Sequence, residues 1–210
     1  MRFILFAWRS WPVMRSSLSG WALVALAVTL LLLPLQWVMG AIIAVAVHEV
    51  CHAAAVRLCG GRITAMQIRP TGMTMAVLGL NAGQELLCAL AGPVGSLLLL
   101  FAASWFPRIA ICAGLQGLYN LLPIYPLDGG RAVRCAAYLL LPGRVGETVC
   151  RWVERGCLVG ILLLGVYGSF HLHLGMLPLF GAFWMILHAI RGKIPCKPWG
   201  NSVQWREKLL

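Results

Sequence analysis

The sequence predicts an all-α membrane protein with about six transmembrane helices and a short membrane-associated β-hairpin between the second and third. Of its 210 residues, 60% are hydrophobic and only 11% are charged, whereas soluble domains are nearer one quarter charged. A chain of this size cannot bury so much apolar sequence in one core. The net charge of +11 comes from basic residues that lie between apolar runs, which favours membrane orientation over a nucleic-acid-binding face.

Five apolar runs have few or no charged residues and are long enough to form spans. They cover residues 20–38, 39–56, 86–106, 109–127 and 156–190. The last run is much longer than the roughly 20 residues that one helix needs, and Gly175 and Pro178 near its middle favour a break. We therefore expect two helices there and six spans in all. The alternative is one overlong helix and five spans.

The basic residues predict the orientation of these spans. With six spans and a cytoplasmic N-terminus, only Arg108 of the 17 basic residues falls outside, as the positive-inside rule requires. The sequence therefore predicts a multi-pass protein of the cell membrane with both ends in the cytoplasm. We expect an N-terminal interfacial segment at 1–19, a six-span core at 20–191 and a short cytoplasmic tail at 192–210.

Residues 60–81 do not have a helical pattern. Pro70, Thr71 and Gly72 form a turn signal, and apolar side chains alternate with Thr74 and Ala76 after it. These features predict a β-hairpin, and the alternative is a plain cytoplasmic loop. Non-helical backbone near a membrane must be shielded by protein or water, so such a hairpin is expected to dip toward a cavity.

The second span contains the sequence HEVCH at residues 48–52. His48 and His52 are four residues apart and therefore share one helix face, from which both can bind one metal ion. Glu49 is placed to act as the general base of a zinc hydrolase. A glutamate in mid-span costs about 2.5 kcal/mol or more and therefore indicates a function. The alternative is two structural histidines beside a carboxylate.

A catalytic zinc ion usually has three protein ligands, and Asp128 is the candidate for the third. It ends the fourth span, which runs in the same direction as the second, so the three side chains are expected at one depth toward the cytoplasm. The alternative for Asp128 is a helix N-cap. Cys51 shares the face of His48, but a thiolate there would close the water position. The other acids are expected in loops or the tail: Glu85, Glu147, Glu154 and Glu207.

Together with the Ala91-Gly92-Pro93 sequence, the motif at 48–52 and the NLLPIYPLDGG sequence at 120–130 resemble the site-2 protease family of intramembrane zinc metalloproteases. The short six-span form is most similar to the stage IV sporulation protease type, which releases a sigma factor from a membrane-bound precursor. The resemblance implies one Zn²⁺ per chain, with His48, His52 and Asp128 as ligands and Glu49 as catalytic base. It also implies substrate-positioning roles for four further residues: Gly72, Asn120, Pro123 and Pro126.

The expected activity is that of a zinc metalloendopeptidase, cleaving membrane-spanning or membrane-associated proteins near the cytoplasmic side. The resemblance implies a sigma-factor precursor or an anti-sigma factor as substrate, membrane-embedded inhibitor proteins and the lipid bilayer as partners, and no nucleic acid. The CBS and PDZ domains of some relatives are not expected in this chain. A metal-ion transporter and a catalytically silent membrane scaffold are the alternatives.

Overall fold

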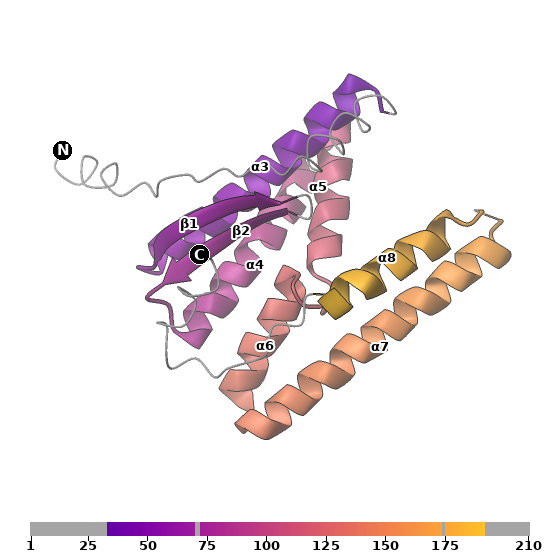
Figure 1. The fold of residues 1–210 in the computed structure, drawn as a ribbon. Helices are drawn as coiled ribbons and strands as arrows, with labels where there is room; N and C mark the ends of the chain where they lie inside the picture. The colour runs from indigo at the N-terminus through magenta and orange to yellow at the C-terminus, as the bar shows by residue number, and fades with distance from the viewer. Residues whose placement is uncertain (1–32, 70–71, 174, 192–210) are drawn as a thin grey trace.

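The computed structural model describes residues 33–69, 72–173 and 175–191, and its chain is mainly helical with one small sheet (Figure 1). The predicted interfacial segment at 1–19, the tail at 192–210 and most of the predicted first span lie outside the described residues. The elements, in chain order, are α3 (Leu35–Leu58), β1 (Arg62–Arg69), β2 (Gly72–Leu78), α4 (Ala82–Leu98), the 3₁₀ helix η1 (Leu99–Ala102), α5 (Pro107–Asn120), α6 (Asp128–Leu140), α7 (Gly143–Phe170) and α8 (Leu177–Arg191).

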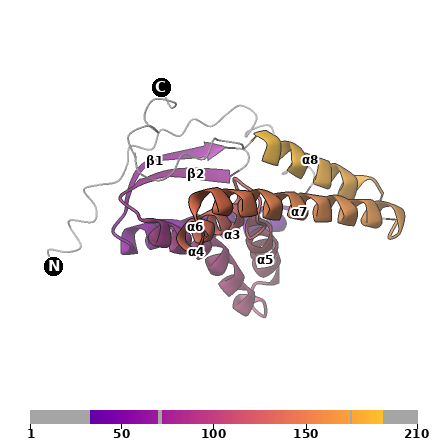
Figure 2. The same cartoon turned by 90° about the horizontal axis from the view of Figure 1, so that it is seen from below.

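The fold contains a packed group of three helices. α3, α4 and α5 all pack against one another, α6 packs against α4, and α7 joins α6 to α8 (Figure 1). The sheet is a two-stranded antiparallel hairpin in which Arg69 faces Gly72 at the turn. It lies along one side of the helices, where β1 contacts α3 (Figure 2). α4 is therefore in contact with both α3 and α6.

Small side chains dominate the buried positions and large apolar ones lie outside. Ala44, Ala89 and Ala113 are buried between helices, whereas Leu58, Phe101 and Leu140 are at least 80% exposed. This is the reverse of a water-soluble core. Helices in a bilayer associate through small residues that let their backbones approach, since lipid tails solvate large apolar side chains as well as protein does.

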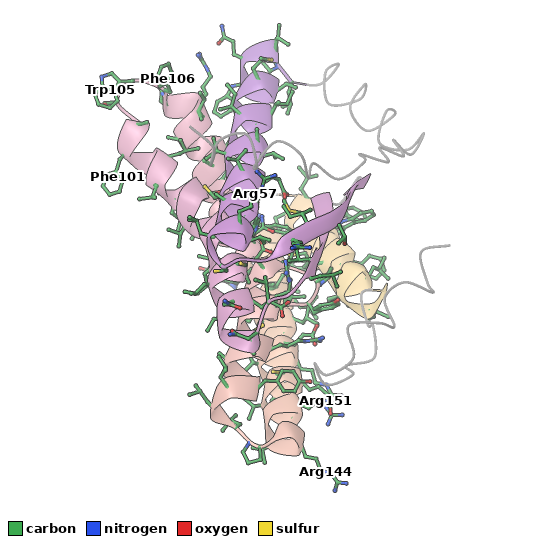
Figure 3. The ribbon with its side chains drawn as sticks, turned by 90° about the vertical axis from the view of Figure 1, so that its left-hand side faces the viewer. Arg57, Phe101, Trp105, Phe106, Arg144 and Arg151 are labelled. Atoms are coloured by element: carbon green, nitrogen blue, oxygen red, sulfur yellow. The ribbon has the colours of Figure 1, made fainter. Side chains whose placement is uncertain are left out.

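Among the described residues, two helical segments are long and apolar enough to cross a membrane. They are Leu35–Leu58 and Ala82–Ala102, and Leu177–Leu187 is a shorter apolar helix. Phe101, Trp105 and Phe106 gather at one end of the molecule, and Arg144 and Arg151 project from the opposite end (Figure 3). Aromatic side chains are enriched at membrane–water interfaces, and arginines are enriched in the segments that flank membrane spans on the cytoplasmic side.

Two predictions about the chain path are confirmed. The hairpin is present, because β1, which ends at Arg69, pairs antiparallel with β2, which begins at Gly72. The apolar run at 156–190 is divided between two helices, because α7 ends at Phe170 and α8 begins at Leu177. Gly175 lies in the connection with φ +73°, a conformation that glycine adopts without strain.

Three predicted boundaries were wrong. Residues 35–38 belong to α3 and not to a separate first span. Pro34 occupies the N-cap position of α3, and proline disfavours a helix interior because it lacks a backbone N–H group. The third apolar helix begins at Ala82 and not at residue 86, since the Asn81 and Gln84 side chains form a capping box. Glu85 therefore lies in the first turn of α4, and Glu147 and Glu154 lie in α7. The prediction of loop positions for these three acids is wrong. The fourth apolar helix ends at Asn120, seven residues before the predicted boundary at 127, because the prolines at 123 and 126 interrupt helical hydrogen bonding.

Candidate metal centre

His48 and His52 lie one turn apart on the buried side of α3. They are 3% and 8% exposed, and their rings meet edge to face with centroids 4.7 Å apart. The two Nε2 atoms are 3.1 Å from each other. The four-residue spacing on a helix therefore directs both rings to one point, as the sequence predicts.

Asp128 reaches the same point from α6. Its Oδ2 lies 3.1 Å from the Nε2 of His48 and 3.0 Å from that of His52. Asp128 is the first residue of α6, and Leu127 occupies the N-cap position. The alternative interpretation of Asp128 as an N-cap is therefore wrong, and its carboxylate faces α3.

Two glycines allow the chain to place Asp128 there. A Cβ atom on Gly129 would collide with the Leu121 carbonyl group, and one on Gly130 with the Ile124 carbonyl group. The segment at 121–127 thus folds back directly onto the first turn of α6. Ile124 within this segment is fully buried and packs near Leu127 and Ala189. The backbone that precedes Asp128 is therefore held in place by tight packing.

α4 orients both histidines through their second ring nitrogen. The Nδ1 of His52 lies 2.7 Å from the Cys88 carbonyl oxygen. Because a carbonyl only accepts, this nitrogen carries a proton, and in the neutral imidazole the Nε2 then presents a lone pair. The Nδ1 of His48 lies 2.9 Å from the hydroxyl of Ser96, which is fully buried, and we assign His48 the same tautomer. Such partners fix the ring orientation of metal-binding histidines.

The donor set fits a metal ion. Its three acceptor atoms, two Nε2 and one Oδ2, lie 3.0–3.1 Å apart, and with both protons on Nδ1 no hydrogen lies between them. Such atoms repel one another unless a cation lies among them. Ligands of a tetrahedral zinc ion are separated by roughly 3.3 Å. Among the described residues, His48, His52 and Asp128 form the group able to hold a metal ion, and all three are buried.

The other predicted site residues are not part of this ligand group. Glu49 is half-buried on α3 next to His48. The Asn120 side chain donates to the carbonyl of Gln116 on its own helix, over 3.2 Å. Pro123 is half-buried and Pro126 exposed in the segment before Asp128. Gly72, the remaining predicted residue, begins β2. The catalytic role of Glu49 and the substrate-positioning roles of the other four residues stay predictions.

The cysteines near the site do not join the ligand group. The Cys51 sulfur packs against Gly95 of α4, where a Cβ atom would collide with it. Cys135 is buried on α6, and burial raises the pKa of its thiol to about 12, so it stays protonated at neutral pH. The hypothesis of a Cys51 thiolate as fourth ligand therefore finds no support in the geometry.

Sequence reasoning missed the contribution of α4. Ser96 and the Cys88 carbonyl are 48 and 36 residues from the histidines they contact, and no local pattern indicates such pairs. Gly92 faces the His52 ring so closely that a Cβ atom would collide with it. The sequence holds one signal of this close approach, because Gly92 stands beside a proline in an apolar helix.

We expect Gly92→Ala to weaken zinc binding by about 10–100-fold, the range typical of changes that disturb a ligand's support. The added methyl group occupies the place of the His52 ring. Gly95→Ala is the matched control, because its methyl group meets Cys51 instead. Chelator competition on the two purified variants measures zinc affinity. Equal losses in both would mean that general packing damage, and not displacement of His52, is responsible.

Comparisons with known proteins agree with the site. The family model described as Peptidase M50B-like matches residues 21–195, so the chain belongs to this peptidase family, within the site-2 proteases. The fold is similar to that of the Site-2 Protease from Methanocaldococcus jannaschii, with a TM-score of 0.59 and 17% identity over 85% of this chain and 88% of that one. The comparison with curated proteins gives no match. The family is membrane-embedded and made up of zinc metalloproteases.

Proposed function

We propose that this chain is an intramembrane zinc metalloendopeptidase with His48, His52 and Asp128 as its metal ligands. One observation carries the proposal: three buried acceptor atoms from α3 and α6 converge, with both histidine Nδ1 protons engaged by α4. Glu49 follows His48 directly, which is the order of base and ligand in zinc hydrolases. Membership of the M50B-like family supports the metalloprotease class.

The chemistry is divided between the metal and the residues around it. Zinc, when bound, supplies Lewis-acid chemistry, polarising a carbonyl and lowering the pKa of water to about 7. Glu49 takes the proton of the attacking water and delivers it to the leaving amine. Ser96 and the Cys88 carbonyl hold the two imidazoles in one tautomer through this cycle. Burial of the ligands keeps bulk water from competing for them.

We propose membrane-spanning or membrane-associated proteins as substrates. A helix in a bilayer keeps its amides hydrogen-bonded internally, so it must unwind locally before a peptide bond is cut. Among the described residues the β1–β2 hairpin forms a two-stranded sheet, and we propose that a strand of it pairs with the unwound segment of the substrate. Asn120, Pro123, Pro126 and Gly72 are the proposed positioning residues. The specific proposal, a sporulation sigma-factor precursor, rests on motif resemblance alone, and an anti-sigma factor is the other candidate.

We also propose six spans with both ends in the cytoplasm. The aromatic cluster near Trp105 and the opposite end bearing Arg144 and Arg151 support this orientation (Figure 3). Arg131 and Arg134 follow Asp128 on α6, and the positive-inside rule favours the cytoplasmic side for these arginines. We therefore propose cleavage toward the cytoplasm.

The test uses the purified full chain in lipid vesicles with two membrane-tethered reporters. One carries the membrane segment of a sigma-factor precursor and the other that of an anti-sigma factor. We expect cleavage that stops when a strong chelator removes zinc and returns when zinc is restored. A zinc-sensitive dye inside the vesicles tests the transporter alternative. Zinc entry without cleavage would establish a transporter, and bound zinc with neither activity would favour a scaffold.

A further inference from the structure

Arg131 of α6 lies between two buried carboxylates. Its Nη1 is 3.5 Å from Oδ1 of Asp128, and its Nη2 is 3.6 Å from Oε1 of Glu85 on α4. The carboxylate side chains are each 12% exposed and the arginine side chain is 37% exposed. The planar guanidinium group has donors on several edges and suits such a bridge better than a lysine ammonium does.

The two oxygens of Asp128 face different partners. Oδ2 is directed at the histidines and Oδ1 at Arg131. Rotation of a carboxylate about its last bond is broad and has no sharp preferred angle, so an unsupported Asp128 would present Oδ2 in many orientations. A donor fixed on Oδ1 restricts that rotation. Arg131 is three residues from Asp128 on α6, a spacing that places both on one face of the helix.

Glu85 links this arrangement to the helix that orients the histidines. α4 already provides Ser96 to His48 and the Cys88 carbonyl to His52. Through Glu85 and Arg131 it also reaches Asp128, the third member of the group. α4 thus supports every ligand without supplying one. The negative charge of Glu85 offsets the positive charge of Arg131, which lessens the repulsion between Arg131 and a cation held by Asp128.

We propose that Arg131, anchored by Glu85, is a positioning residue that orients Asp128 for zinc. This inference rests on the proposed zinc site and goes beyond it by assigning a role to an ion pair outside the ligand group. The competing explanation is a plain structural link between α4 and α6. The chain contains a matched example of such a link in Arg134, which lies one turn further along α6.

Arg134 makes an ion pair with Glu154 of α7 at 3.9 Å, and its guanidinium lies 4.2 Å above the Tyr125 ring centroid. It resembles Arg131 in charge, helix and type of partner. These two partners of Arg134, Glu154 and Tyr125, are not members of the ligand group. A loss of general helix packing should therefore affect both arginine variants, and a loss of ligand orientation only one.

The experiment measures zinc affinity by chelator competition on the full chain in detergent, for Arg131→Gln, Arg131→Lys and Arg134→Gln. We expect zinc affinity to fall about 10–100-fold in both Arg131 variants, as for other changes to groups that support metal ligands. It should stay within about twofold in Arg134→Gln. Absorption spectra of the cobalt-substituted proteins should shift for the Arg131 variants only, because they report ligand geometry directly.

The sign of the change separates orientation from charge alone. Removing a cation near a metal site favours a bound cation electrostatically, so Arg131→Gln would then bind zinc more tightly. Weaker binding supports positioning, and equal or tighter binding overturns it. Should Arg131→Gln fail to fold, Arg131→Lys keeps the charge and answers the same question.

Glu85→Gln tests the anchor. We expect it to weaken zinc binding in the wild-type background and to add nothing to Arg131→Gln, because Glu85 acts through Arg131. Equal, additive losses in both backgrounds would refute this linkage. The proposed function fails separately, if the wild-type chain binds no zinc or cleaves no reporter. Wild-type zinc binding with unaffected Arg131 variants would remove only the positioning role.

Discussion

Asp128→Ala is expected to remove zinc from the purified protein and to abolish cleavage of the vesicle reporters. The wild-type chain should retain about one zinc ion after dialysis against a mild chelator, whereas the variant should retain far less. The substitution deletes the only carboxylate of the ligand group and leaves two imidazoles, fewer than the three protein ligands of a catalytic zinc site. Inductively coupled plasma mass spectrometry measures the metal content.

Two further variants make the result specific. Glu147→Ala removes one negative charge from an exposed position on α7 and should leave the zinc content unchanged. Asp128→Asn keeps the shape of the side chain and removes its charge, so it separates the effect of the carboxylate from that of side-chain volume. Zinc retained in Asp128→Ala would mean that the third ligand lies elsewhere.

The helical repeat explains why the shared position of His48 and His52 can be predicted from the sequence. The His48 and His52 spacing determines a shared helix face wherever the helix lies, so their convergence follows from the helical repeat alone. Asp128 is separated from His48 by 80 residues and was placed by a topological argument about depth. That argument needs only the directions of the second and fourth predicted spans. The basic residues that flank these apolar runs indicate both directions.

The supporting contacts could not be predicted in the same way. Ser96 looks like any small residue of an apolar helix, and its contact with His48 depends on how α3 crosses α4. The apolar run begins directly after Glu85, so hydropathy alone predicts a loop position for this residue. The Asn81 and Gln84 capping pair is a local signal that does mark the helix start at Ala82, so that error was avoidable. The contact between Glu85 and Arg131 depends on how α4 packs against α6, and no local sequence pattern predicts it.

The course of the backbone can likewise be predicted from the sequence in one place and not in another. Gly175 and Pro178 predict the break between α7 and α8, since both disfavour a continuous helix. The return of residues 121–127 onto Gly129 and Gly130 was not predicted. The two prolines indicate that a helix stops there, but the direction the chain then takes depends on backbone contacts that no spacing encodes.

The remaining large effect is expected from Glu49→Gln, which should leave zinc bound and lower the rate of cleavage by about 10²–10⁴-fold, the range for loss of a general base. Glutamine has nearly the same shape as glutamate but cannot take a proton from water. Glu147→Gln, at an exposed position of α7, is the matched control and should cleave normally. Zinc content and cleavage rate are measured on the same preparations.

This substitution separates the three candidate functions because Glu49 is not in the ligand group. A protease should keep its metal and lose its activity, which distinguishes Glu49→Gln from Asp128→Ala, where both are lost together. A transporter that uses only the metal-binding residues should still carry zinc, and a scaffold should show no change in any measured property. Cleavage that continues in Glu49→Gln would require another base, and among the described acids Glu85 is then the first to test, because it is buried on the helix that supports the site.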